Sequence, residues 1–209
     1  MAAVLGEQGR IDALVNNAGA GYAGALEDTS LEEARAQFET NFFGMHRLCR
    51  AVLPAMRAQR GGGIVNMSSL GGFVSVSFQG FYCASKFAVE AYSEALRMEV
   101  RPFGIHVSMI EPGDYATGFT ASRRMVAGAD GGSAYAERCR RAVSQMAQDE
   151  SGDTGIGPVV RKVLAVLEAS NPCLRNPVAS AVQRVLVALR PVMPESVSKY
   201  VMMSTYGIR

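Results

Sequence analysis

Short apolar runs alternate with long helical patterns through the first half of the chain, and this alternation limits the possible folds most strongly. The apolar runs cover residues 11–15, 64–67 and 105–110, and the helical patterns between them cover 30–60 and 80–100. Each helical pattern is long enough for a right-handed crossover between parallel strands. The order therefore predicts an α/β fold in which helices cover a parallel sheet.

A turn of polar residues or glycine follows each predicted strand. These turns cover residues 16–19, 68–72 and 111–117. Parallel strands end at the same edge of their sheet, and ligands bind in the crevice beyond those ends. We therefore expect the three turns to form one binding site.

Local signals give bounds for the other elements. Residues 2–9 are typical of the end of a helix that stops at Gly9. Ser30 and Glu33 form a capping-box pattern, which indicates a helix start, and Pro54 allows a kink or break near the end of that helix. In the second half, the patterns predict helices over 135–148, 157–169 and 178–189, a turn over 171–176 and an apolar tail over 197–208.

Residues 114–155 are rich in Gly, Ala, Arg and Ser, with scattered apolar positions. A long excursion after a strand that ends at a binding site is suited to be a substrate loop or lid, although a surface loop is the alternative. Because the sequence contains no domain-scale linker, we expect residues 1–209 to form a single, partial domain.

Composition excludes several classes of function. The net charge is only +2, which does not indicate a nucleic-acid partner. The four cysteines are far apart and the two histidines have no neighbouring ligands, so we expect no metal site. The spacing of the cysteines also gives no disulfide framework, so we expect a cytoplasmic location. No apolar run reaches the roughly 18 residues of a membrane helix, and the N-terminus lacks a signal-peptide pattern.

Tyr82 and Lys86 lie four residues apart in the predicted helix 80–100, so they lie on one face of it. A phenol has a pKa of about 10, and a nearby ammonium favours the phenolate. The pair could therefore transfer protons. A solvated helix face is the alternative explanation for the same spacing.

Five motifs between residues 9 and 117 resemble those of the short-chain dehydrogenase/reductase family, in its order and spacing. They are the turn Asn16-Asn17-Ala18-Gly19, Asn41, Ser69, the pair Tyr82 and Lys86, and Pro112-Gly113 with Thr117. The resemblance implies a Rossmann-type three-layer α/β/α fold and an enzyme that interconverts an alcohol and a ketone or aldehyde with NAD or NADP.

The same resemblance implies roles for the catalytic residues. Tyr82 is expected to be the general acid/base, Lys86 to lower its pKa and hold the nicotinamide ribose, and Ser69 to orient the carbonyl. Asn41 is expected to anchor a water that carries protons. The residues implied in cofactor binding are Asn16, Ala18, Gly19, Tyr82, Lys86, Pro112, Gly113 and Thr117.

The resemblance also suggests a substrate and an assembly. The segments 82–88 and 111–114 look most like members that act on steroids, retinoids or other lipid-like alcohols. Helices 30–60 and 80–100 form the oligomer interface in the family, which implies a homodimer or homotetramer.

One part of the family pattern is missing. The family begins with a strand and a glycine-rich turn that seats the cofactor pyrophosphate, and the sequence has no such turn after a strand. We therefore expect an N-terminally truncated fold in which strand 11–15 becomes an edge. On this interpretation, the chain alone would be poorly soluble or bind no dinucleotide.

Two alternative functions follow. A truncated, non-catalytic chain could use its two long helices only to join a full-length partner. A relative that epimerises or dehydrates nucleotide-sugars also uses a Tyr-x-x-x-Lys pair, but such chains carry a larger C-terminal domain than the 92 residues that follow Thr117.

Overall fold

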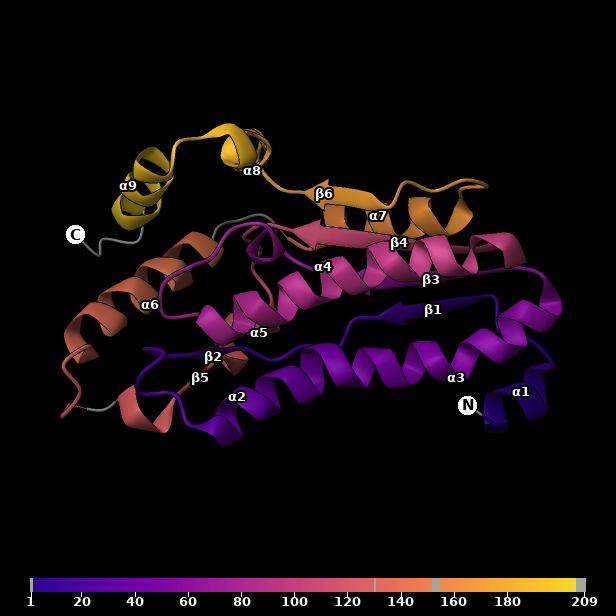
Figure 1. Ribbon diagram of the computed structural model, residues 1–209, viewed down its shortest axis with the longest axis horizontal. Coiled ribbons are helices and arrows are strands. Elements are labelled where there is room, and N and C mark those ends of the chain that lie inside the picture. Colours follow the sequence, from indigo (N-terminus) through magenta and orange to yellow (C-terminus); the bar gives the residue numbers. More distant parts are fainter. Residues whose placement is uncertain (1, 130, 152–154, 206–209) are drawn as a thin grey trace.

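Four parallel strands form the central sheet of the protein. The computed structural model describes residues 2–129, 131–151 and 155–205 of the chain (Figure 1). The strands lie in the order β1-β3-β4-β6, and all neighbouring pairs are parallel. Their bounds are β1 Ala13–Asn16, β3 Gly62–Met67, β4 Ile105–Pro112 and β6 Arg175–Val178. The prediction of a parallel α/β fold is confirmed.

Helices cover both faces of the sheet and give three layers. Helices α3 (Gly44–Gln59) and α4 (Gly80–Val100) pack on one face, where Ile64 points into their shared core. Helix α7 (Gly157–Glu168) packs on the other face, where Val65 points into a second core. Neighbouring residues of β3 thus pack into cores on opposite faces of the sheet, because successive side chains of a strand point to opposite faces.

The predicted helix over 30–60 consists of three parts. Helix α2 (Leu31–Phe38) begins at Ser30 with the predicted capping box, since the Glu33 amide donates to Ser30 Oγ and the Ser30 amide donates to the Glu33 carboxylate. A π-helical turn over Glu39–Phe43 then joins α2 to α3. Pro54, which allows a kink or a break, lies inside α3, and the helix continues to Gln59. The N-terminal helix α1 (Ala2–Gln8) ends at Gly9 as predicted.

The prediction of a turn over 171–176 is wrong for its last two residues. Arg175 and Asn176 begin β6, which pairs with β4 from Met109–Arg175 to Pro112–Val178. Pro177 argues against a central strand, because proline has no amide hydrogen for the ladder. It is accommodated because β6 has β4 on one side and is an edge of the described sheet.

The remaining elements gather where the strands end. In Figure 1 the arrows of β1, β4 and β6 point toward the end of the molecule where α5, α6, α8 and α9 lie. Their bounds are α5 Gly118–Ser122, α6 Ala136–Glu150, α8 Ala181–Leu189 and α9 Glu195–Thr205, and a small parallel pair joins β2 Tyr22–Ala23 to β5 Arg124–Met125. Residues 130 and 152–154 of the predicted segment 114–155, and 206–208 of the predicted tail, lie outside the described residues.

Strand β1 is the other edge of the sheet. Within the described residues it pairs only with β3, and Val15 is 40% exposed. The expectation that strand 11–15 is an edge strand is therefore confirmed. No helix among the described residues is both long and apolar enough to cross a bilayer.

Candidate functional site

A cavity of about 900 Å³ opens at the carboxyl ends of the strands. All three turns predicted to meet at this edge contribute to its wall. The predicted site residues that line it are Ala18, Gly19, Ser69, Tyr82, Lys86, Pro112, Gly113 and Thr117. Asn17 also lines the cavity. The convergence predicted from the strand order is therefore found in the structure.

Tyr82 lies in the first turn of α4 and lines the cavity. Burial raises the pKa of its phenol to about 12, although a hydrogen bond with the Ser69 side chain lowers it. The Phe119 ring lies 5.4 Å from the Tyr82 ring, centroid to centroid, and helps to exclude water. The phenol is therefore protonated at neutral pH in this state, opposite to the direction predicted from the Lys86 charge.

Lys86 lies one helical turn after Tyr82, and only 6% of it is exposed. Its ammonium donates to the Met67 carbonyl, with an Nζ–O distance of 2.8 Å, and lies 5.8 Å from the centroid of the Tyr82 ring. Burial lowers the Lys86 pKa to about 8, and the Glu90 carboxylate opposes that effect. The ammonium therefore faces the Tyr82 ring, while its hydrogen bond goes to the end of β3.

Asn41 lies within the π-helical turn and is 3% exposed. Its Nδ2 donates to the Ala20 carbonyl at 3.1 Å and to Ser85 Oγ at 3.0 Å, and its Oδ1 accepts from the Ala20 amide at 2.8 Å. The side chain therefore fixes the turn after β1 against α4. π-helical turns often occur at functional sites.

Gly19 brings that turn close to two functional groups. A Cβ at Gly19 would lie 3.7 Å from Asn41 Oδ1 and 3.9 Å from Lys86 Nζ. These distances leave the backbone of residues 18–19 open to the cavity beside the ammonium. The turn and Lys86 therefore line the cavity together, and Asn41 lies behind the turn.

Asn16 has a different position from the other predicted cofactor-binding residues, because it does not line the cavity. Its Nδ2 donates to Asn66 Oδ1 at 2.8 Å and to Cys49 Sγ at 3.3 Å, and Asn66 Nδ2 donates in turn to Ser93 Oγ. This buried chain of hydrogen bonds ties β1 to β3, α3 and α4. Asn17, the next residue, faces the cavity instead.

Ser69 and Thr117 each cap a short helix while lining the cavity. Ser69 Oγ accepts from the Gly71 amide at 3.0 Å, and Thr117 Oγ1 accepts from the Phe119 amide at 3.2 Å, where α5 begins. Both hydroxyl groups also remain able to donate a hydrogen bond. Each hydroxyl can therefore cap its helix and also donate a hydrogen bond to a ligand in the cavity.

The rest of the cavity wall is largely apolar. Much of it comes from helices α6, α7, α8 and α9 and from the segment between α8 and α9, and its apolar members include Met146, Val160, Val163, Leu164, Leu186, Val187, Met193 and Val201. Such a wall suits the hydrocarbon part of a ligand.

Three charged residues beneath the site were not identified from the sequence. Glu90 of α4 and Glu111 of β4 are both buried, and Arg175 of β6 forms an ion pair with Glu90. Burial raises the pKa of Glu111 to about 8, and it also raises the pKa of Glu90. The sequence feature that could have identified them is a charged residue in a mostly apolar segment, as Glu90 is in its helix and Glu111 at the end of its strand.

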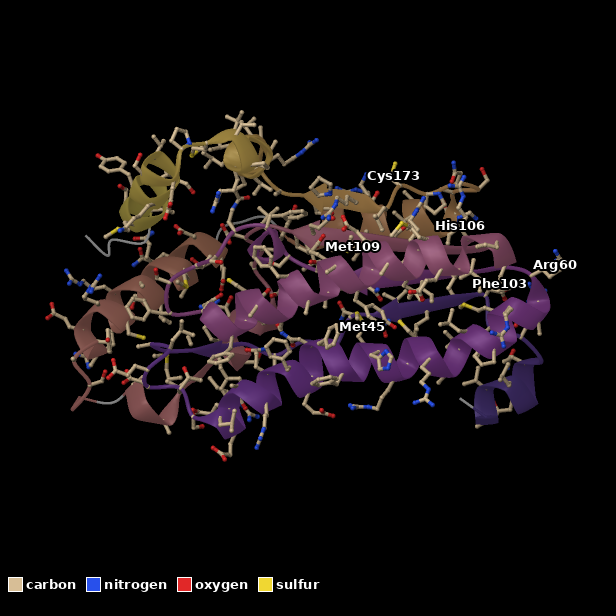
Figure 2. All side chains as sticks on the ribbon, in the orientation of Figure 1. Met45, Arg60, Phe103, His106, Met109 and Cys173 are labelled. Carbon is tan, nitrogen blue, oxygen red and sulfur yellow. The ribbon has the colours of Figure 1, made fainter. Side chains whose placement is uncertain are left out.

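The described residues contain no group of three or more His, Cys, Asp or Glu side chains arranged to hold a metal ion. His46 lies beside Tyr92, with 3.2 Å between Nδ1 and the phenol oxygen. His106 is the second residue of β4, at the end of the sheet opposite α5, α6, α8 and α9 (Figure 2). Neither histidine lines the cavity.

Comparison with known proteins identifies the family. The family model described as short chain dehydrogenase matches residues 1–127. The chain belongs to the short-chain dehydrogenase family. A relative named 3-ketodihydrosphingosine reductase, from Bacteroides thetaiotaomicron, is 40% identical over 206 residues, which are 99% of this chain and 77% of the relative. Human retinol dehydrogenase 8 is 48% identical over 112 residues, which are 54% of this chain and 36% of that protein.

Solved structures of short-chain dehydrogenases have the same fold. One from Streptomyces avermitilis has a TM-score of 0.80 and 33% identity, with 97% of this chain and 72% of that chain covered. A short-chain dehydrogenase/reductase from Burkholderia phymatum in complex with NAD has a TM-score of 0.76 and 26% identity, covering 91% and 69%. ElxO with NADP bound has a TM-score of 0.53 and 28% identity, covering 55% and 46%.

The family assignment makes the chain an oxidoreductase of the short-chain dehydrogenase type, and relatives in this family have been crystallised with NAD or NADP. The chain spans about three quarters of the Bacteroides reductase, and its alignment with retinol dehydrogenase 8 covers about one third of that protein. The substrate, the roles of individual residues and the assembly are matters for proposal.

Proposed function

We propose that this short-chain dehydrogenase interconverts an alcohol and a ketone or aldehyde on a lipid-like substrate, using NAD or NADP. The observation that carries the proposal is the meeting of Tyr82, Ser69 and Lys86 in the wall of one largely apolar cavity. A phenol, a hydroxyl and an ammonium are the groups needed to move a proton to or from a substrate oxygen.

In this proposal Tyr82 exchanges a proton with the substrate oxygen. Its raised pKa keeps the phenol protonated, so the described state is prepared to donate a proton to a carbonyl that is being reduced. Ser69 donates a hydrogen bond to the same oxygen and orients it. In the cofactor complex Lys86 lowers the pKa of Tyr82, and Asn41 anchors a proton-carrying water beside it.

The cavity fits the nicotinamide end of the cofactor. The Lys86 ammonium has three donors, and the Met67 carbonyl takes one of them, which leaves donors for ribose hydroxyls. The Gly19 backbone lies beside the Lys86 ammonium, and Pro112, Gly113 and Thr117 also line the cavity. A bound nicotinamide supplies the hydride transfer.

Two kinds of observation support a lipid-like substrate. The cavity wall of α7, α8 and α9 is mostly apolar. Two relatives bear names that specify a ketodihydrosphingosine and a retinol, both of which are lipid-like. The segment 114–155 supplies part of this wall through Phe119 and Met146, which supports its assignment as the substrate loop of a single domain.

A cytoplasmic location completes the proposal. All four cysteines are free, including the exposed Cys173, as a reducing compartment would keep them.

The proposal is tested with the purified chain, NADH or NADPH and a series of ketones of increasing chain length. Loss of absorbance at 340 nm reports reduction. Tyr82→Phe should lower the rate by the 10²–10⁴-fold typical of a general acid. Tyr22→Phe, outside the cavity, is the matched control. If Tyr82→Phe keeps nearly full activity, the proposed reaction is refuted, and if the purified chain reduces no ketone, the non-catalytic alternative is favoured instead.

An exposed apolar surface supports assembly with another chain, either in an oligomeric enzyme or in a non-catalytic chain that joins a full-length partner. Five large apolar side chains are exposed along α2, the π-helical turn, α3 and α4, namely Leu31, Phe43, Leu48, Phe87 and Met98. We propose this surface as the interface of a homodimer or homotetramer. Phe43→Glu should lower the molar mass measured by light scattering, whereas an unchanged mass would contradict the interface.

A further inference from the structure

The buried Lys86 ammonium lacks a direct carboxylate partner. Within the described part of the chain, no carboxylate forms an ion pair with its Nζ, and its hydrogen bond goes to the neutral Met67 carbonyl. A buried ammonium without a counter-charge loses its proton or destabilises the fold. The charge on Lys86 must therefore be supported from outside its immediate contacts.

Glu90 is placed to give that support. It follows Lys86 by four residues in α4, so the two side chains lie on one face of the helix, and Glu90 is only 5% exposed. A Cβ at Gly72 would lie 3.3 Å from Glu90 Oε1 and 3.0 Å from Ser68 Oγ. Glu90 therefore reaches the strand end between Met67, which binds Lys86, and Ser69, which lines the cavity.

Arg175 holds Glu90 from the other side. Its Nη1 pairs with Glu90 Oε2, and its Nη2 pairs with the exposed Glu94. The guanidinium lies over the Phe73 ring, 4.8 Å from the centroid, which fixes its plane. The same Nη1 is 4.0 Å from Glu111 Oε1, so one arginine faces two buried carboxyl groups.

The two carboxyl groups compete for that arginine. Glu90 Oε1 and Glu111 Oε1 are both buried and lack a hydrogen-bond partner in the described structure. Two neighbouring buried carboxyl groups do not both ionise readily, so one retains a proton while the other is ionised. The direct ion pair with Arg175 favours ionisation of Glu90 over Glu111, which lies farther from the guanidinium.

We propose that Glu90 is a positioning residue that keeps the buried Lys86 side chain charged, and that Arg175 keeps Glu90 ionised for this purpose. The role of Lys86 in catalysis rests on the proposed function, but the link between the three side chains does not. Arg175 on β6 thus acts on the charge of Glu90 on α4, and Glu90 acts on the charge of Lys86 at the cavity.

The direction of each pKa agrees with this order. Burial lowers the pKa of Lys86, and Glu90 is the charged group that raises it. Burial raises the pKa of Glu90, the nearby Ser68 hydroxyl and then the Arg175 charge lower it, and Glu94 raises it. Burial and the charge of Glu90 raise the pKa of Glu111, and Arg175 lowers it. Tyr82, whose ring faces the ammonium, is the remaining titratable neighbour.

The pKa of Lys86 can be measured directly, without turnover. The chain has only three lysines, Lys86, Lys162 and Lys199, so the side-chain ¹⁵N signals of a labelled sample are few enough to assign. Glu90→Gln should lower the Lys86 pKa by about one unit, a tenfold change in its acid dissociation constant. Lys162 and Lys199 are internal references and should not move.

Matched variants decide between this role and a general loss of structure. Arg175→Met should lower the Lys86 pKa in the same direction, because Glu90 would then take up a proton. Glu94→Gln removes the exposed partner of Arg175 and should leave Lys86 unchanged. Glu90→Asp keeps the charge and should restore most of the effect, which also provides a variant if Glu90→Gln does not fold.

An unchanged Lys86 pKa in Glu90→Gln would overturn the proposal, and so would equal shifts in Glu94→Gln and Glu90→Gln. If Glu90→Gln does not fold, an unshifted Lys86 in Arg175→Met has the same meaning. These outcomes are independent of the ketone assay: the ¹⁵N titration tests the Lys86 charge even if the proposed reaction fails, and Tyr82→Phe tests the reaction even if Glu90 has no influence.

Discussion

Replacing Glu111 by Gln should stabilise the protein increasingly as the pH rises. The Glu111 carboxyl group has no exposed surface, and its Oε2 accepts from the Asn176 amide at 2.6 Å while its Oε1 has no hydrogen-bond partner. Burial, with the nearby Glu90, raises its pKa from 4.5 to about 8. A glutamine keeps an oxygen for the Asn176 amide and cannot ionise, so it removes only the titration.

The sign and size of the effect follow from proton binding. Between pH 4.5 and about 8 the folded state keeps a proton on Glu111 that the unfolded state releases, so stability falls as the pH rises through this range. Each pH unit contributes about 1.4 kcal/mol, and the whole range corresponds to about 5 kcal/mol. This is comparable with the total stability of about 5–15 kcal/mol of a typical domain.

Urea unfolding followed by circular dichroism at several pH values between 4.5 and 8 measures the effect. The difference in unfolding free energy between Glu111→Gln and the natural sequence should grow by about 1.4 kcal/mol per pH unit. Glu94→Gln, on a side chain that is 47% exposed, should show no comparable slope. A constant difference for Glu111→Gln across the range would refute the assignment of a protonated buried carboxyl group.

Three further predictions concern stability and are measured by the same unfolding assay. Gly104→Ala should lower the free energy of unfolding by more than about 1 kcal/mol, because Gly104 has a φ of +73° and a Cβ there would lie 2.7 Å from the Arg60 carbonyl oxygen. Gly61→Ala is the control and should cost less, because no atom lies within 4 Å of a Cβ at Gly61. Ser30→Ala should cost about 1 kcal/mol by removing the N-cap of α2, and an unchanged midpoint would contradict the capping box. Asn66→Ala should cost about 2–4 kcal/mol, because it leaves buried partners on β1 and α4 without their hydrogen bonds, and a cost below 1 kcal/mol would show that the chain of amides contributes little.

The alternation of short apolar runs and long amphipathic helices was sufficient to predict the parallel sheet and the edge at which the cavity lies. Helix α4 has the predicted bounds, Gly80–Val100, because its apolar period continues without interruption. Strand β6 was not predicted, because its four residues include Pro177 and follow an Asn-Pro pair, both of which are turn signals. Only its pairing with β4 makes it a strand.

The candidate site was predictable where residues close in sequence also meet in the structure, as Tyr82 and Lys86 do. The charge network of Glu90, Glu111 and Arg175 was not, because it joins residues that are up to 85 positions apart. The pKa of Tyr82 also depends on burial, which the pattern of neighbouring charges does not contain. Spacing therefore predicted which groups meet, and packing determined their electrostatics.

The π-helical turn over Glu39–Phe43 has a consequence for how the length of this segment can vary. Gln37 before it and Asn41 within it both hydrogen-bond to Ala20, and both are buried. Each residue of an α-helix rotates the following ones by about 100° about the axis. Deleting one residue here would turn α2 by about that angle relative to α3 and carry Gln37 away from Ala20. Insertions and deletions should therefore be excluded from residues 37–43, while the ends of α2 and α3 farther from the turn are freer to change length.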